Sequence, residues 1–249
     1  MRRRQELYSM SDAYNVGAQQ SLEHRMHLEE GMSMLTTRIS GIASYPYADG
    51  SINVDARLML FTLGGSAGYR QVYRNQTFAP GADRSRDARI EREKDGNFDS
   101  QGYAYGEGRF RMVVPLDPLF LVATGTLRYE DCEDNSFDWY HAFVHDHGLM
   151  EKAEGTLFYR HRDFGAIGPY LRFMNVPRMS SDGESKRANE LNYGFVYGTR
   201  PGLVRPRGGN SDLLLVQMVV KFGDKDFGLH PYHLPAYPLV VYRAVLHVL

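Results

Sequence analysis

Histidine and carboxylate side chains are most concentrated in the segment "EDCEDNSFDWYHAFVHDHG", which runs from residue 130 to residue 148. His141, His145 and His147 are separated by even numbers of residues, so on a strand they would share one face. Three imidazoles beside carboxylates can hold Zn²⁺ or act as acids and bases. A polar, solvated external loop has the same composition, and we favour that interpretation. We therefore expect no metal, no cofactor and no catalytic residue, with the three histidines as the alternative candidates for a metal site.

Two other features of the sequence, Cys132 and the stretch "DGNFD", contain residue types that can bind metal ions. Cys132 is the only cysteine of the chain, which excludes an intrachain disulfide and a CxxC metal site. No side chain that could act as a base for the thiol is evident beside Cys132 in the sequence, so we expect an unreactive thiol at the surface. The stretch "DGNFD" begins like a calcium-binding loop, but Ser100 and Gly106 stand where such a loop has Gly and Glu. We interpret it as a turn.

A different pattern involves arginine, and it recurs along the chain. In "YGEGRFRMVV", Glu107, Arg109 and Arg111 alternate with small or apolar residues. Such alternation is typical of strands that have one polar and one apolar face. We predict that the polar faces line the interior of a barrel, with the following lumen-lining residues: Asp55, Arg57, Arg70, Arg74, Glu107, Arg109, Arg111, Arg128, Glu154, Arg160, Arg172 and Arg243.

The segments that carry these residues follow one another through turns and loops, with hardly any helical periodicity. We count about ten strands and predict an all-β fold, a closed antiparallel up-and-down transmembrane β-barrel. A single barrel domain is expected over residues 21–249, preceded by a loosely ordered N-terminal tail over residues 1–20, because that polar stretch shows no strand pattern.

The links between the strands alternate between mostly long and mostly short. The short ones include "LGGS", "PLDP" and "DFGAIG", and a meander gathers them at one end of a barrel. No window approaches the roughly 18 apolar residues of a transmembrane helix. From about Arg25 to Leu249 the chain resembles a bacterial outer-membrane β-barrel in its strand periodicity and loop rhythm.

This resemblance implies a location in the outer membrane of a Gram-negative bacterium, with outer-membrane lipid as the surrounding partner. The start of the chain, "MRRRQELYSM", lacks the apolar core of a signal peptide, so we expect that such a peptide has been removed. The long charged loops offer contacts to other envelope proteins. The net charge of −1 argues against a nucleic-acid partner.

Three functions remain open. The first is a non-enzymatic barrel, either a narrow porin-like conduit for transport or a scaffold that displays its loops, because an arginine-lined lumen attracts small anions unless its charges neutralise one another. The second is a soluble lipocalin-like barrel that binds an apolar ligand, with the faces reversed. The third is an outer-membrane hydrolase resembling the omptins, which use Asp and His at the barrel rim.

Overall fold

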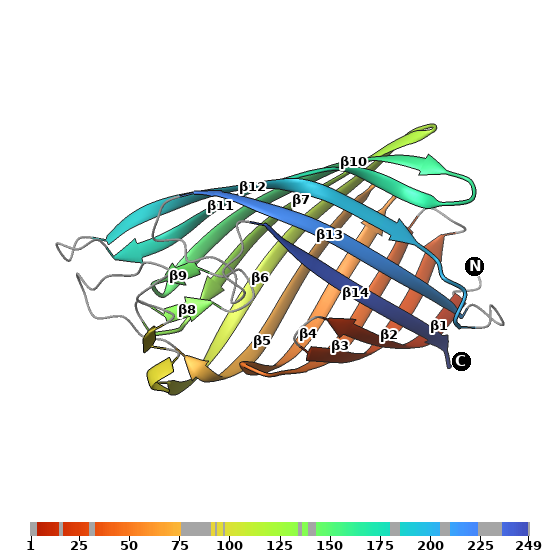
Figure 1. The fold of residues 1–249 in the computed structure, drawn as a ribbon. Helices are drawn as coiled ribbons and strands as arrows, with labels where there is room; N and C mark the ends of the chain where they lie inside the picture. Colours follow the sequence, from red (N-terminus) through yellow and green to blue (C-terminus); the bar gives the residue numbers. More distant parts are fainter. Residues whose placement is uncertain are drawn as a thin grey trace.

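The computed structural model describes residues 4–14, 17–29, 33–75, 91–92, 94–96, 98–133, 136–138, 143–179, 185–204, 210–223 and 236–248. Within this part of the chain, twelve strands close into one antiparallel barrel, in the ring order β1-β14-β13-β12-β11-β10-β7-β6-β5-β4-β3-β2 (Figure 1). The strands are β1 (Arg4–Tyr14), β2 (Gly17–Glu29), β3 (Ser33–Ser44), β4 (Tyr47–Leu58), β5 (Phe61–Asn75), β6 (Asp99–Leu116), β7 (Leu119–Glu130), β10 (Gly148–His161), β11 (Gly165–Met179), β12 (Ser185–Thr199), β13 (Ser211–Gly223) and β14 (Ala236–His247). A separate short hairpin pairs β8 (Ser136–Asp138) with β9 (Phe143–His145).

The all-β closed barrel is confirmed, but it has twelve strands and not about ten. The expected tail over residues 1–20 is wrong for the described residues, because β1 and the start of β2 lie there and β1 pairs with β14 to close the ring. The outward positions of β1 include Ser9, Ser11 and Ala13, which are small. This strand therefore lacks the apolar alternation by which the others were recognised.

The two ends of the barrel differ in their connections. The end that holds both termini also holds the tight turns after β4, β6 and β10, and is called the turn end below (Figure 1). The links after β5, β7, β11 and β13 lie at the opposite end, called the loop end. The segregation predicted from the sequence is therefore present in part: the short turns after β1 and β3 also lie at the loop end, and the long link after β12 lies at the turn end.

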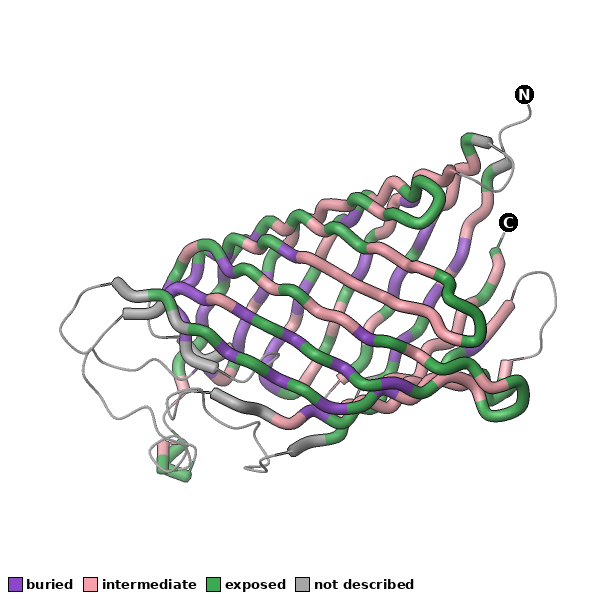
Figure 2. Tube along the Cα trace, turned by 90° about the horizontal axis from the view of Figure 1, so that it is seen from above, coloured by how far each residue is buried: buried purple, intermediate pink, exposed green. Residues whose placement is uncertain are grey.

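Burial alternates along the strands (Figure 2). Large apolar side chains are exposed on the outer face, including Ile39, Leu63, Leu127, Leu171 and Phe195. The buried set contains many charged and amide side chains. A lipocalin-like barrel needs the reverse, so the faces argue against that alternative. An apolar exterior around a polar interior is the architecture of an outer-membrane β-barrel.

Aromatic side chains gather near both ends of the outer face. Tyr69, Tyr73 and Tyr129 are exposed toward the loop end, and Tyr159 and Phe164 toward the turn end. Such girdles are typical of residues that sit at the two interfaces of a bilayer.

No helix among the described residues is long and apolar enough to cross a membrane.

Candidate functional site: an arginine-rich lumen

Charged side chains on the inner face form cross-strand clusters in the half of the barrel nearer the loop end. Arg70 Nε donates to Asp49 Oδ2 at 3.0 Å, and the Tyr105 hydroxyl donates to Asp49 Oδ1 at 2.8 Å. Arg70 and Asp49 are both buried, and the guanidinium also lies over the Tyr47 ring. A buried ion pair whose remaining groups are hydrogen-bonded holds neighbouring strands in register.

A second cluster connects β4 and β6 across β5. Arg109 Nη2 donates to Asp55 Oδ1 at 3.1 Å, and Nη1 contacts Glu107 Oε1 at 3.2 Å. Gly64 stands between Asp55 and Arg109 in the pairing register, and a Cβ there would lie 1.8 Å from Asp55 Oδ1. The missing side chain is therefore what lets the ion pair pass over the intervening strand.

Arg128 extends this cluster to β7. Its Nε donates to Glu130 Oε1 at 2.6 Å, its Nη1 lies 3.5 Å from Glu107 Oε2, and its guanidinium covers the Tyr105 ring at 3.7 Å. The guanidinium is thus held from three sides along the wall of the lumen.

Two further candidates with polar partners lie on β10 and β11, the strands that follow β7 in the ring. Glu154 accepts from the Tyr170 hydroxyl at 2.7 Å and lies 3.4 Å from Lys152 Nζ. Arg172 Nη2 lies 3.7 Å from Glu190 Oε1, and both side chains are buried. These contacts run along the wall between adjacent strands or within one strand.

Two predicted residues contact aromatic rings. Arg74, near the loop end, lies over Phe98 at 3.9 Å and over Tyr45 at 4.6 Å. Arg160, near the turn end, is exposed and lies 5.2 Å from the Phe120 ring. Cation–π contacts of this kind fix the position of a guanidinium without neutralising it.

Positive charges of arginines act on one another across the lumen in the half nearer the turn end. Arg111 on β6 is repelled by the positive charges of Arg57 on β4 and of Arg243 on β14, and it is attracted by the negative charge of Asp55. Strands β6 and β14 are six places apart in the ring of twelve, so they form opposite walls. Arg57 and Arg111 occupy inward positions and yet are exposed, which indicates that water reaches the lumen at this level.

The charge at this level is only partly compensated. Arg243 donates to both carboxylate oxygens of Asp12, at 2.7 and 2.8 Å. Among the described residues, neither Arg57 nor Arg111 has an ion-pair partner. The term arginine constriction is used below for Arg57, Arg111 and Arg243.

Several inward residues were missed by the sequence analysis. Asp12 lies in the predicted N-terminal tail, and Glu23 and Asp49 were not among the predicted lumen-lining residues, although all three are buried. Glu190 and Asn192 were also missed. The available signal was their alternation with the apolar residues Leu191 and Tyr193.

The histidine candidates are not brought together. His141 lies outside the described residues. His145 is 1% exposed, whereas His147 is exposed. Cys132 was expected at the surface, and this is wrong: it is buried, with Sγ 3.8 Å from His145 Nδ1, because it packs against Tyr47 of the inner wall.

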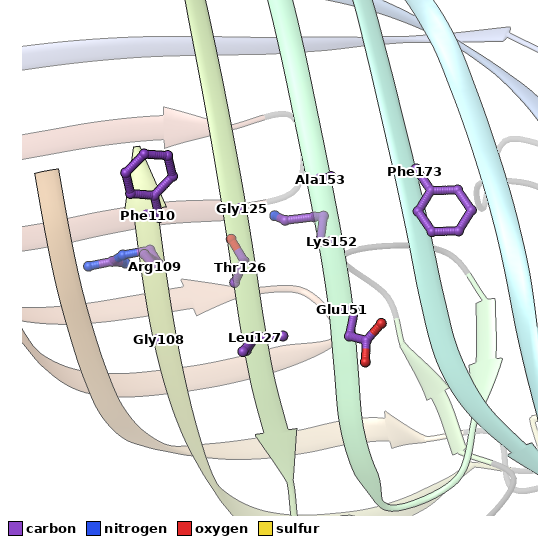
Figure 3. A pocket seen from close by; sticks show the side chains of 10 residues that line it. All are labelled: Gly108, Arg109, Phe110, Gly125, Thr126, Leu127, Glu151, Lys152, Ala153 and Phe173. Carbon is purple, nitrogen blue, oxygen red and sulfur yellow. The ribbon is translucent and has the colours of Figure 1, made fainter. Parts of the chain in front are cut away.

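A hollow of about 500 Å³ lies over β6, β7, β10 and β11 (Figure 3). Its floor contains Gly108, Gly125 and Ala153, and the exposed Phe110 and Phe173 border it. These positions belong to the outer face, so the hollow opens on the apolar surface of the barrel. Arg109, Thr126 and Lys152, at inward positions, also line it.

No family model matches the chain, and no curated protein matches it. Some solved structures resemble it in shape. LpxR from Salmonella typhimurium is 9% identical, with 97% of this chain and 100% of that chain covered and a TM-score of 0.45. A chain from a study of the in-meso crystallization of membrane proteins is 8% identical, with 97% and 83% covered and a TM-score of 0.47. OmpT, an outer membrane protein of Vibrio cholerae, is 6% identical, with 98% and 97% covered and a TM-score of 0.31. At such identities and TM-scores, these likenesses carry no argument about function.

Proposed function

We propose that this protein is a non-enzymatic outer-membrane barrel that acts as a narrow conduit favouring small anions. The observation that carries the proposal is the arginine constriction, in which Arg111 meets the charges of Arg57 and, from the opposite wall, of Arg243. Fixed positive charge in a narrow lumen between low-dielectric walls raises the local concentration of anions and repels cations.

The location in a bilayer is supported by the exposed apolar outer face. Leu58, Leu171 and Phe195 are each more than half exposed, which is unfavourable in water over so large a surface. We expect the protein to require detergent for extraction and to migrate differently on a gel when it is not heated. A protein that stays soluble without detergent would contradict the proposal.

Ion selectivity is the direct test of the conduit. The refolded protein is added to a planar lipid bilayer that separates two KCl concentrations, and the reversal potential is measured. We expect discrete channel openings, with a reversal potential close to the equilibrium potential of chloride. In the double variant Arg57→Gln/Arg111→Gln the reversal potential should move toward zero, because two uncompensated charges of the constriction are lost.

A matched control removes an arginine from the outside of the barrel. Arg187 is exposed near the loop end and lies 3.5 Å from Glu151 on the same outer face. The variant Arg187→Gln should keep the reversal potential of the wild type. An equal shift in this variant, or cation selectivity of the wild type, would contradict an anion-selective lumen.

A closed scaffold is the second candidate, and one observation favours it. Inward residues in the loop half, such as Met174, Glu190 and Asn192, are at most 1% exposed. This indicates dense packing near the mouth, and a silent bilayer recording from correctly folded protein would support the scaffold in place of the conduit.

A further inference from the structure

Three side chains of different chemistry meet at the loop end, inside the mouth of the barrel. Glu130 is the last residue of β7, Cys132 follows two positions later, and His145 ends β9. Their exposed fractions are 1%, 8% and 1%, and one ligand atom from each lies within 4.8 Å of the others. The three residues are called the mouth cluster below.

Glu130 has one satisfied and one unsatisfied oxygen. Its Oε1 accepts from Arg128 Nε at 2.6 Å. Its Oε2 is fully buried, has no hydrogen-bond partner, and lies 3.5 Å from His145 Nε2. A buried carboxylate oxygen without a partner is unfavourable, so an unsatisfied one that points into a cluster of ligand groups indicates a missing cation.

The orientation of His145 supports the same conclusion. Its Nδ1 lies 3.0 Å from the main-chain carbonyl oxygen of Asp146, which can only accept a hydrogen bond. Nδ1 therefore carries the proton, and in the neutral ring the lone pair is on Nε2, facing the lone pairs of Glu130 Oε2. Histidines that ligate metals commonly donate their other ring N–H to a main-chain carbonyl in this way.

We propose that Glu130, Cys132 and His145 bind one divalent transition-metal ion, with Zn²⁺ as the ion that fits best. Thiolate, imidazole and carboxylate are the ligand types that Zn²⁺ accepts, whereas Ca²⁺ and Mg²⁺ prefer oxygen alone. Two such ligand atoms in tetrahedral geometry around Zn²⁺ are about 3.3 Å apart. The 3.5 Å between Nε2 and Oε2 is close to that separation. Cys132 Sγ lies 3.8 Å from Nδ1, the ring nitrogen that does not bind the ion, so the thiolate must turn toward Nε2 when it becomes the third ligand.

The ion would fasten the link between β7 and β10 to the inner wall. Cys132 packs in a buried cluster with Tyr47, Val72 and Tyr103 of that wall. The Asp146 main-chain N–H donates to the carbonyl oxygen of Pro177 on β11 at 3.1 Å. A metal in the mouth cluster therefore holds this link across the loop-end opening of the barrel.

Cobalt provides a spectroscopic test on the full-length protein in detergent. After reduction and removal of bound metal, Co²⁺ is titrated into the folded protein. We expect one equivalent to produce the near-ultraviolet charge-transfer band of a thiolate bound to cobalt, and visible bands of a tetrahedral ion. Zn²⁺ should then abolish both. Wild-type protein that shows no thiolate band would overturn the proposal.

Variants separate a metal site from a buried ion pair. Cys132→Ser should lose the thiolate band, and Glu130→Gln and His145→Gln should each weaken Co²⁺ binding at least about tenfold. His147→Gln, on the exposed neighbour, should bind as the wild type does. A thiolate band that persists in Cys132→Ser contradicts the site. Migration of unheated samples on a gel shows which variants are folded. If a variant is not folded, the Co²⁺ titration of the wild-type protein alone tests the metal site.

Discussion

Arg243 in the last strand donates two hydrogen bonds to Asp12 in the first strand, at 2.7 and 2.8 Å, across the seam where β14 meets β1. The two residues are paired directly in the register of this seam. The Asp12 side chain is only 2% exposed, so the carboxylate depends on this partner. The pair therefore acts as a clasp at the point where the barrel closes.

Removal of the Asp12 charge should loosen the seam. Asp12→Asn keeps the shape of the side chain but weakens two charge-assisted hydrogen bonds, so we expect a loss of about 1.5–3 kcal/mol in the free energy of unfolding. The loss is measured by unfolding the protein in lipid vesicles with urea and reading the folded fraction from the migration of unheated samples on a gel. Ala13→Ser, at the exposed neighbour, should change stability little. Equal losses in the two variants would contradict the role of the clasp.

The absence of a side chain at Gly64 supports the ion pair that crosses it. A methyl group in Gly64→Ala would displace Asp55 Oδ1 and separate it from Arg109, so we expect a loss of roughly 1–3 kcal/mol. Gly65 is the control because a Cβ there meets only Glu107 O at 3.5 Å. Gly65→Ala should therefore change unfolding by less than about 0.5 kcal/mol. The same urea measurement compares the two variants. Similar losses of stability would show that the effect of Gly64→Ala comes from the backbone and not from contact of the new methyl group with Asp55.

The sequence predicted the faces of the strands better than their number. Arg109 and Arg111 alternate with Gly108 and Phe110, and a period of two is direct evidence for a strand with two different faces. The strand with Asp12 lacks this signal, since its outward residues include Ser9, Ser11 and Ala13, which are small. It was recognisable only through its pairing with β14, which is a contact between the two ends of the chain.

The mouth cluster lay beyond the reach of periodicity for a different reason. Glu130 and Cys132 are close in the chain, but His145 reaches them only because the link between β7 and β10 folds back against the wall. The alternation of His145 with His147 was visible in the sequence. The sequence did not show that His145 would be buried while His147, two residues later, would be exposed.

The depth of a residue on the outer face should determine what a charge costs there. Leu171 lies near the middle of β11 and Ile167 near its turn end, and both are exposed on the outer face. If the barrel spans a bilayer, Leu171→Arg should cost about 2–4 kcal/mol and Ile167→Arg about 0–1 kcal/mol. Unfolding in vesicles measures both variants. Equal costs would indicate that this face does not contact the hydrocarbon core.

The negative charge beside the arginine constriction should limit its preference for anions. Asp55 binds Arg109 and opposes the positive charge around Arg111. Asp55→Asn removes that charge while the arginines remain, so we expect the reversal potential in a KCl gradient to move further toward the chloride value, opposite to the Arg57→Gln/Arg111→Gln change. Glu151→Gln removes the same charge from the outer face and should leave the potential unchanged. A shift of Asp55→Asn toward the potassium value, or an equal shift in Glu151→Gln, would show that the charges of the lumen do not determine which ions pass.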